Sequence, residues 1–93
     1  MKSNKITIES LSLDLVRVAN SYHRGSIKVG DRFLEEAIKR INEIERSEIK
    51  PSFLNVLIKI RSELVKNDKM LAGENALMYS VICRNYVSKY YSS

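Results

Sequence analysis

Apolar residues recur at steps of three and four along most of this chain, and this spacing constrains the fold more than any other feature. Residues at these steps share one face of a helix, whereas a half-buried strand needs alternation at every second residue. The 93 residues include only 3 Gly and 1 Pro, too few for the many tight turns of a sandwich or barrel. We therefore predict an all-α fold, a small antiparallel bundle of about four helices.

Glycine, proline and capping residues set the expected boundaries. Residues 1–6 are expected to form a flexible N-terminal arm, followed by a single helical domain over 7–93. Gly25 and Gly30 flank the linker 25-GSIKVG-30. The predicted helices span 8–24 after Thr7, 31–47 after Asp31, 51–66 from Pro51, and 68 or 74 to 91, where Asp68 can cap an early start.

The last predicted helix carries two apolar stripes, and the sequence leaves open which of them is buried. We expect it to pack through Leu77, Val81 and their neighbours, so that a stripe of Tyr79, Cys83, Tyr86 and Tyr90 faces elsewhere. In the alternative, Tyr79 and Tyr86 belong to the core and only the last turn is exposed. The helix over 51–66 is also broadly apolar, because Leu54, Ile58 and Val65 widen its stripe, and such a helix is central or shares an interface.

The net charge of +5 and the pI of about 9.5 favour an acidic partner, either nucleic acid or an acidic protein face. A charge of this size is also ordinary for a soluble small domain. The single cysteine, Cys83, allows no internal disulfide, and the chain has no signal-peptide or membrane-spanning run, so a cytoplasmic location is expected. No spacing of His, Cys or acidic residues predicts a metal site, and no glycine-rich motif predicts a cofactor.

One short segment, Arg17-VANSY-His23, resembles the arginine–spacer–histidine signature of the HEPN family of small helical ribonucleases. The resemblance implies a nuclease site formed by these two residues. The spacing, however, places them on different faces of a helix, and surface roles for both are the simpler interpretation. We expect the protein not to be an enzyme.

A polar stripe on the helix over 51–66 suggests a second function, independent DNA binding. Ser, Asn and Lys side chains contact base edges and phosphates, and a helix-turn-helix would place this helix in the major groove. The alternative is an ordinary solvated face. The stripe consists of Ser52, Asn55, Lys59, Ser62 and Lys66, at steps of three and four.

The sequence favours protein binding most strongly, through an apolar and aromatic face on the last two helices. Tyrosine suits such interfaces, because its ring buries area while its hydroxyl remains hydrated. The predicted partner-binding residues are Tyr79, Tyr86, Tyr90, Tyr91, Leu54 and Ile58. The basic residues expected to contact DNA or an acidic surface are Lys59, Arg61, Lys66, Lys69, Arg84 and Lys89.

The length, the four-helix pattern, the composition and the ending 85-NYVSKYYSS-93 resemble the small accessory subunits of the crenarchaeal B-family replicative DNA polymerase holoenzyme. This resemblance implies a non-catalytic subunit that binds the large polymerase subunit and supports DNA synthesis. It carries over no site residues. A homodimer built on the same face remains open, because a self-complementary patch has the same pattern in a sequence.

Overall fold

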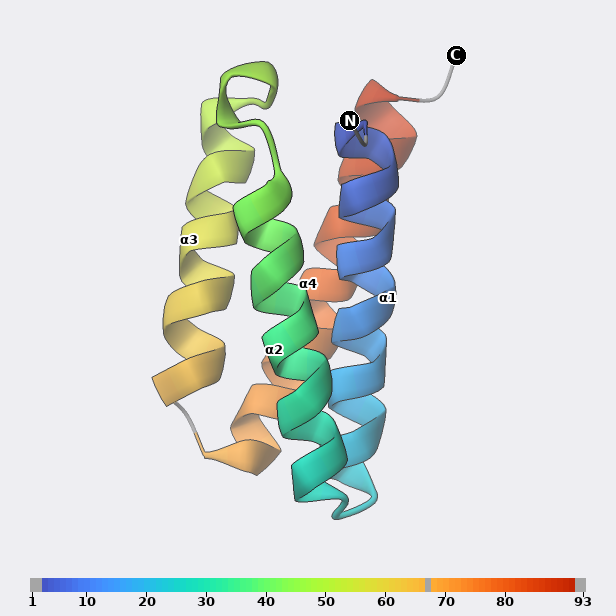
Figure 1. Cartoon of the computed structure of the whole chain (residues 1–93), viewed down its shortest axis with the longest axis vertical. Helices are drawn as coiled ribbons and strands as arrows, with labels where there is room; N and C mark the ends of the chain where they lie inside the picture. The colour runs from blue at the N-terminus through green and yellow to red at the C-terminus, as the bar shows by residue number, and fades with distance from the viewer. Residues whose placement is uncertain (1–2, 67, 92–93) are drawn as a thin grey trace.

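Four helices follow one another along the chain and run alternately up and down (Figure 1). The computed structural model describes residues 3–66 and 68–91, and this part of the chain contains no strand. The helices are α1 (Asn4–His23), α2 (Ile27–Glu43), α3 (Pro51–Lys66) and α4 (Lys69–Tyr90), with a one-turn 3-10 helix, η1 (Arg46–Glu48), between α2 and α3. The predicted all-α antiparallel bundle of four helices is confirmed.

Helix α1 begins at Asn4, four residues earlier than predicted. Ser3 rather than Thr7 caps it, because the Ser3 hydroxyl accepts a hydrogen bond from the backbone N–H of Ile6 at 3.3 Å. Asn4 is buried and exchanges two hydrogen bonds with the backbone of Glu45, of 3.0 and 2.9 Å. Residues 4–6 therefore belong to the helix and not to an arm. Residues 1 and 2 lie outside the described residues.

Helix α2 also begins and ends four residues earlier than predicted, so the expected linker 25–30 is wrong. Gly25, at φ +80°, ends α1 in the left-handed region, and α2 starts two residues later. Gly30 lies inside the helix, where the ring of Tyr22 occupies the space that a Cβ would need. Asp31 is consequently not a cap. Its carboxylate accepts hydrogen bonds from the Tyr22 hydroxyl at 2.5 Å and from Lys69 Nζ at 2.9 Å.

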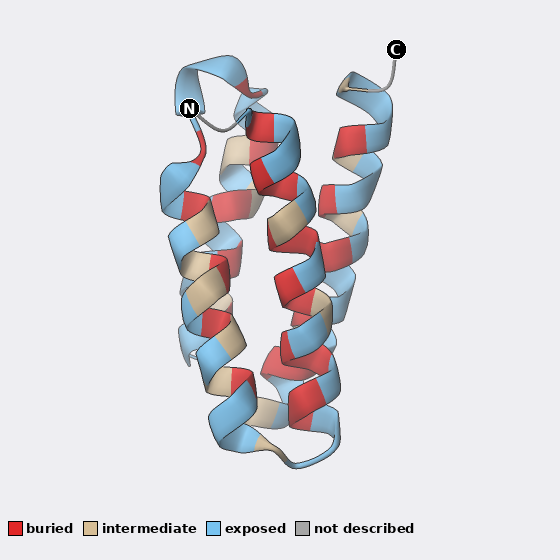
Figure 2. Cartoon of the chain, turned by 45° about the vertical axis from the view of Figure 1, so that its right-hand side comes forward, coloured by how far each residue is buried: buried red, intermediate tan, exposed pale blue. Residues whose placement is uncertain are grey.

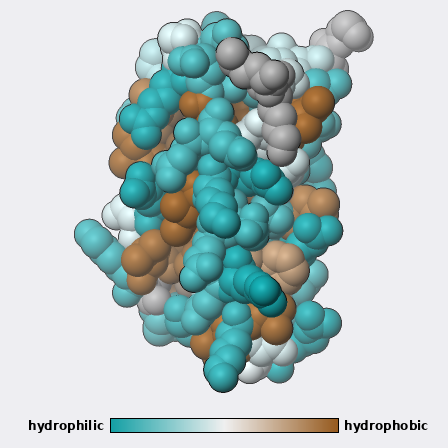
Figure 3. Space-filling view, viewed as in Figure 1, coloured by the Kyte–Doolittle hydropathy of each residue, from teal (hydrophilic) through white to brown (hydrophobic). Residues whose placement is uncertain are grey.

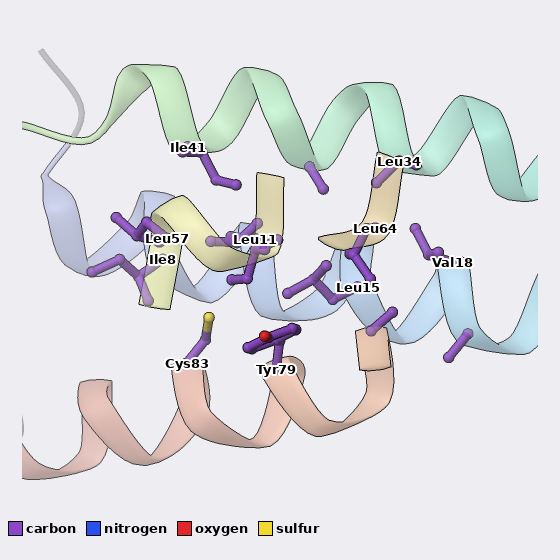
Figure 4. Packing of buried hydrophobic residues seen from close by; sticks show 14 of the residues in the cluster. Ile8, Leu11, Leu15, Val18, Leu34, Ile41, Leu57, Leu64, Tyr79 and Cys83 are labelled. Carbon is purple, nitrogen blue, oxygen red and sulfur yellow. The ribbon is translucent and has the colours of Figure 1, made fainter. Parts of the chain in front are cut away.

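The core lies where the apolar stripes of all four helices meet (Figures 2 and 4). The apolar residues that recur at steps of three and four along α1, from Ile8 to Tyr22, are buried, and on α3 Phe53, Leu57, Ile60 and Leu64 are buried. Helix α1 packs against α2 and α4, whereas α3 packs mainly on α4 and only lightly on α2. The buried side chains include Ile8, Leu11, Leu15, Val18, Leu34, Ile41, Phe53, Leu57, Ile60, Leu64, Tyr79 and Cys83.

Small residues bring α1 and α4 close together. The Ser12 hydroxyl donates a hydrogen bond to the backbone oxygen of Ser80 at 2.9 Å. A Cβ added at Gly73 would lie 3.3 Å from Tyr22 Cβ and 3.6 Å from the backbone oxygen of Ala19. Side chains of this size allow two helix backbones to approach closely, so α1 and α4 form a close contact.

The packing expected for the last helix is wrong. Helix α4 buries Tyr79, Cys83 and its small residues, while the side chains of Leu77 and Val81 are 51% and 38% exposed. The reason is steric: only the side of α4 that carries small residues can fit against α1. Asp68 caps the helix as predicted, since its carboxylate accepts the backbone N–H of Leu71 at 3.0 Å.

Candidate protein-binding groove

An apolar groove of about 440 Å³ separates α2 from α3. Ile41 and Leu57 form its buried floor, Leu54 is half-buried in its wall, and the side chain of Ile58 is 55% exposed at its edge. Figure 3 shows hydrophobic surface beside the hydrophilic side chains that run down the middle of this face. Two of the predicted partner-binding residues, Leu54 and Ile58, thus lie together in one groove.

The groove exists because α3 packs on α4 rather than on α2. The central stripe of α3 is used by the core, so residues one step around the helix face the gap toward α2. Large side chains stand in that gap, and Arg61 Nη1 reaches across it to Asn42 Oδ1 at 3.4 Å. Along the chain, η1 and its short flanking segments link the two helices (Figure 1).

The charge around the groove has a single sign. Arg46, Arg61 and Lys66 line it, and no acidic residue is among the described residues that do so. Arg61 and Lys66 were predicted from the sequence as contacts for DNA or an acidic surface, whereas Arg46 was not. An apolar floor between cationic side chains fits an apolar ligand surface that carries carboxylates or phosphates at its edges.

Tyr79 belongs to the core rather than to a binding surface. Its side chain is 4% exposed, and its hydroxyl donates a hydrogen bond to the Glu63 carboxylate on α3. Burial, together with this hydrogen bond and the negative charge of Glu63, raises the pKa of Tyr79 to about 12. The residue therefore joins α4 to α3 and is not available to a partner in this structure.

Tyr86 and Tyr91 are half-buried at the end of α4, whereas Tyr90 is 44% exposed. The Tyr86 ring stacks on Phe53 with centroids 3.9 Å apart and an interplanar angle of 7°. Its hydroxyl also accepts the backbone N–H of Lys50 at 3.1 Å. The alternative considered from the sequence, with Tyr79 and Tyr86 in the core and the last turn exposed, describes this end of the helix better.

The C-terminal tyrosines form their own hollow beside residues 47–50, which shares no described lining residue with the α2/α3 groove. Lys50 Nζ and Lys89 Nζ each lie 5.3 Å from the centroid of the Tyr90 ring, within the range of a cation–π contact. The predicted partner-binding residues are therefore divided among the groove, the core and this aromatic end.

The six predicted basic contacts are likewise divided among several faces. Arg61 and Lys66 line the groove, and Lys59 is exposed on the solvent side of α3. Lys69 pairs with Asp31 at 2.9 Å, and Arg84 lies in a hollow between α1 and α4. Lys89 lies beside Tyr90, so the structure gathers only part of the basic charge on one surface.

All five residues of the polar stripe on α3 are exposed, as a solvated or nucleic-acid-binding face requires. Their setting differs from a helix-turn-helix, because α2 and α3 run side by side in opposite directions (Figure 1). A helix-turn-helix joins its helices at a steep angle by a short turn. Insertion of α3 into a major groove would therefore need a different geometry from the one expected.

Arg17 and His23 line one hollow of about 330 Å³ with Asn20, Arg24 and Phe33, although the spacing predicted different faces. Both side chains are partly exposed, and Arg17 Nη1 lies 3.5 Å from the Asp14 carboxylate. No acidic residue is among the described residues that line this hollow. The arrangement can bind an anion, but it offers one imidazole and no carboxylate partner for it.

Two further features of the described structure were missed in the sequence. One is the exposed apolar side of α4, which the apolar spacing alone could not distinguish from its buried side. The other is a buried carboxylate on α1: the Asp14 side chain is 7% exposed and lies 3.6 Å from Arg40 Nε. Burial raises the pKa of Asp14, and the positive charges of Arg40 and Arg17 offset part of that rise.

Comparison with known proteins finds no matching family model, no matching curated protein and no matching solved structure. Within residues 3–66 and 68–91, no helix combines the length and the apolar character needed to cross a membrane. The described side chains also include no group of three His, Cys, Asp or Glu placed to hold a metal ion.

Proposed function

We propose that this protein is a non-catalytic accessory subunit that binds a larger DNA-replication protein through the groove between α2 and α3. The observation that carries the proposal is the apolar groove of about 440 Å³, lined by Leu54 and Ile58 and edged by Arg46, Arg61 and Lys66. Open apolar surface of this kind is a feature of interaction sites. The resemblance of the sequence to polymerase accessory subunits supports the replicative DNA polymerase as the partner.

The groove fits an amphipathic helix with acidic residues along its edges. Such a helix places apolar residues at i, i+3 or i+4, and i+7 into a groove, as the groove residues Leu54, Ile58 and Ile41 require. Carboxylates on either side of that apolar stripe would pair with the three cationic groups at the rim. The apolar contacts supply most of the affinity, while the charges guide encounter and orientation.

The test compares two isoleucines of nearly equal exposure. Ile58 in the groove is 55% exposed, and Ile6 at the start of α1 is 53% exposed and lies outside the groove. Tagged chains carrying Ile58→Glu or Ile6→Glu are used in a pull-down from native extract treated with nuclease, and bound proteins are identified by mass spectrometry. We expect the polymerase to be retained by the wild type and by Ile6→Glu and to be lost with Ile58→Glu.

Binding to the purified polymerase gives the quantitative version of this test. A charge in place of an apolar side chain that the ligand covers weakens binding by about 10-fold or more, so Ile58→Glu should raise the Kd by at least that factor. Equal binding by both variants would place the contact elsewhere. Absence of the polymerase from all nuclease-treated samples would contradict the proposed partner.

Independent DNA binding is the second candidate function, and it is favoured by the exposure of all five residues of the polar stripe on α3. A duplex-binding protein loses affinity steeply as salt rises, because phosphate contacts release counterions. Removing Lys59 and Lys66 together should then lower both the affinity and the dependence on salt. Binding of duplex DNA that is absent, or insensitive to salt, would count against this function.

A further inference from the structure

The outward side of α4 carries a regular stripe that the proposed groove does not use. Its members stand at alternating steps of four and three along the helix, the spacing of a coiled-coil seam. Met70, Leu77 and Val81 are 68%, 51% and 38% exposed, and Glu74 and Arg84 are exposed as well. The stripe consists of Met70, Glu74, Leu77, Val81, Arg84 and Ser88.

This side of the molecule lies away from the groove. Helix α1 packs beside α4, and the hollows along their junction are lined by members of the stripe. The groove opens between the other two helices, α2 and α3 (Figure 1). A ligand on the stripe and a ligand in the groove can therefore be bound at the same time, and the two sites can be tested separately.

The stripe is complementary to itself when two copies of α4 lie antiparallel. A two-fold axis at the level of residue 79 places Leu77 opposite Val81 of the second copy and Glu74 opposite Arg84 of the second copy, because each pair is equally distant from that level. Antiparallel coiled coils pair residues of the two alternating seam positions in this way. The apolar pair lies at the centre and the opposite charges lie on either side of it.

Glu74 and Arg84 need a second molecule to form such a pair. They are ten residues apart on one helix, which separates them by roughly 15 Å at about 1.5 Å per residue. Neither forms an ion pair with any of the residues that the structure describes. Glu9 lines the same hollow as Arg84 but is not paired with it. In a two-fold dimer the Glu74–Arg84 pair is formed twice.

Helix α1 widens the apolar centre at the level of the axis. The hydrogen bond from the Ser12 hydroxyl to the Ser80 backbone places the neighbouring Leu13, which is 50% exposed, beside the middle of the stripe. Val16 follows on the same side of α1 and is half-buried. An apolar centre with polar ends is the usual composition of a dimer interface. We propose that the protein forms a homodimer in which the outward stripes of α4 pair antiparallel, with Leu13 at the two-fold axis.

Sedimentation of the full chain tests this proposal. The wild type is expected to change from the 10.7 kDa chain to twice that mass as its concentration rises. Arg84→Glu places like charges opposite each other on both sides of the apolar centre, and should raise the dimer Kd by about 10-fold or more. The double variant Glu74→Arg with Arg84→Glu exchanges the two charges. It should restore the wild-type Kd, because residues 74 and 84 of the two copies again carry opposite charges.

Two further variants complete the experiment. Lys59→Glu makes the same change of charge on exposed α3, so it controls for net charge and should leave dimerisation unchanged. Leu77→Glu should abolish the dimer while circular dichroism still reports a folded helical chain. A wild type that stays monomeric at about 100 μM overturns the proposal. A dimer that persists in Leu77→Glu, or a double variant that is no tighter than Arg84→Glu, also overturns the proposed pairing.

Discussion

The α1/α4 contact and the α2/α3 contact are both made by antiparallel neighbours, but they are built from side chains of opposite size. Ser12, Ala19, Gly73 and Ser80 allow α1 and α4 to meet closely. Between α2 and α3, branched and long side chains such as Ile58 and Arg61 stand in the gap and leave an open groove. One contact is closed by small residues, and the other is held open by large ones.

This difference separates stability from binding. A close contact has little volume to spare, so a substitution there changes packing density directly. The exposed side chains that line an open groove can be substituted with little effect on folding, because they are already partly in water. The molecule can therefore use the α2/α3 side for a ligand without weakening the contacts that hold the bundle together.

The largest expected effect is the loss of stability on enlarging a residue in the close contact. Gly73→Leu inserts a side chain where even a Cβ lies 3.3 Å from Tyr22, and it should lower the free energy of unfolding by about 3 kcal/mol. Ser62→Leu adds a similar side chain to the groove and should change it by less than about 0.5 kcal/mol. Urea denaturation followed by circular dichroism measures both.

Gly73→Ala is the control for backbone freedom. Alanine gains up to about 1 kcal/mol of helix propensity over glycine, and a tight but small Cβ contact offsets it, so the net change should stay within about 1 kcal/mol. If Gly73→Leu and Ser62→Leu had the same effect, the contrast between the closed and open contacts would be wrong.

The next effect concerns the aromatic end of α4, where neighbouring rings differ in burial. Tyr86→Ala removes the ring stacked on Phe53 and the acceptor for Lys50 N–H, and should cost about 2 kcal/mol. Tyr90 is 44% exposed, so Tyr90→Ala should cost less than about 1 kcal/mol. Thermal unfolding of the two variants provides the comparison. A larger loss for Tyr90→Ala would show that its exposed ring contributes more to the fold than the stacked one.

The start of α3 and the buried side of α1 were the features that the sequence predicted well. Pro51 fixed the start of α3, and the single stripe of α1 identified its buried side. The start of α1 could not be predicted, because the bonds of Asn4 to Glu45 join residues 41 positions apart. The start of α2 was missed because glycine usually interrupts a helix, whereas Gly30 is required there by the Tyr22 ring.

The buried side of α4 shows where apolar spacing stops being informative. Both of its sides carry apolar residues, so the choice depends on which side fits against a neighbour. The small residues Ala72, Gly73, Ala76 and Ser80 were the available signal. Four residues of the groove were predicted individually as binding residues: Leu54, Ile58, Arg61 and Lys66. Tertiary packing brings them together with Ile41 and Arg46 of other segments, and the sequence alone does not show this.

The smallest effect is a difference in pH dependence between two aspartates, which extends the comparison to the α1/α2 side. Burial raises the pKa of Asp14, whereas hydrogen bonds from Tyr22 and Lys69 lower the pKa of Asp31. A raised pKa means that the protonated form stabilises the fold: this contribution is complete below the unfolded value near 3.8 and is lost as pH rises through the folded value. A lowered pKa has the opposite sign, so the contribution of Asp31 is lost as pH falls.

The free energy of unfolding of Asp14→Asn and of Asp31→Asn is compared with that of the wild type at pH 7 and near pH 4. The difference isolates each aspartate, because the other ionisable groups are the same in the wild type and the variant. The wild type should gain stability relative to Asp14→Asn as the pH falls, and should lose it relative to Asp31→Asn. If both variants shifted in the same direction, Arg40 and Arg17 would outweigh burial at Asp14. Asp14 would then stabilise the contact between α1 and α2 as one half of an ion pair. The expectation that burial of its charge is costly would be wrong.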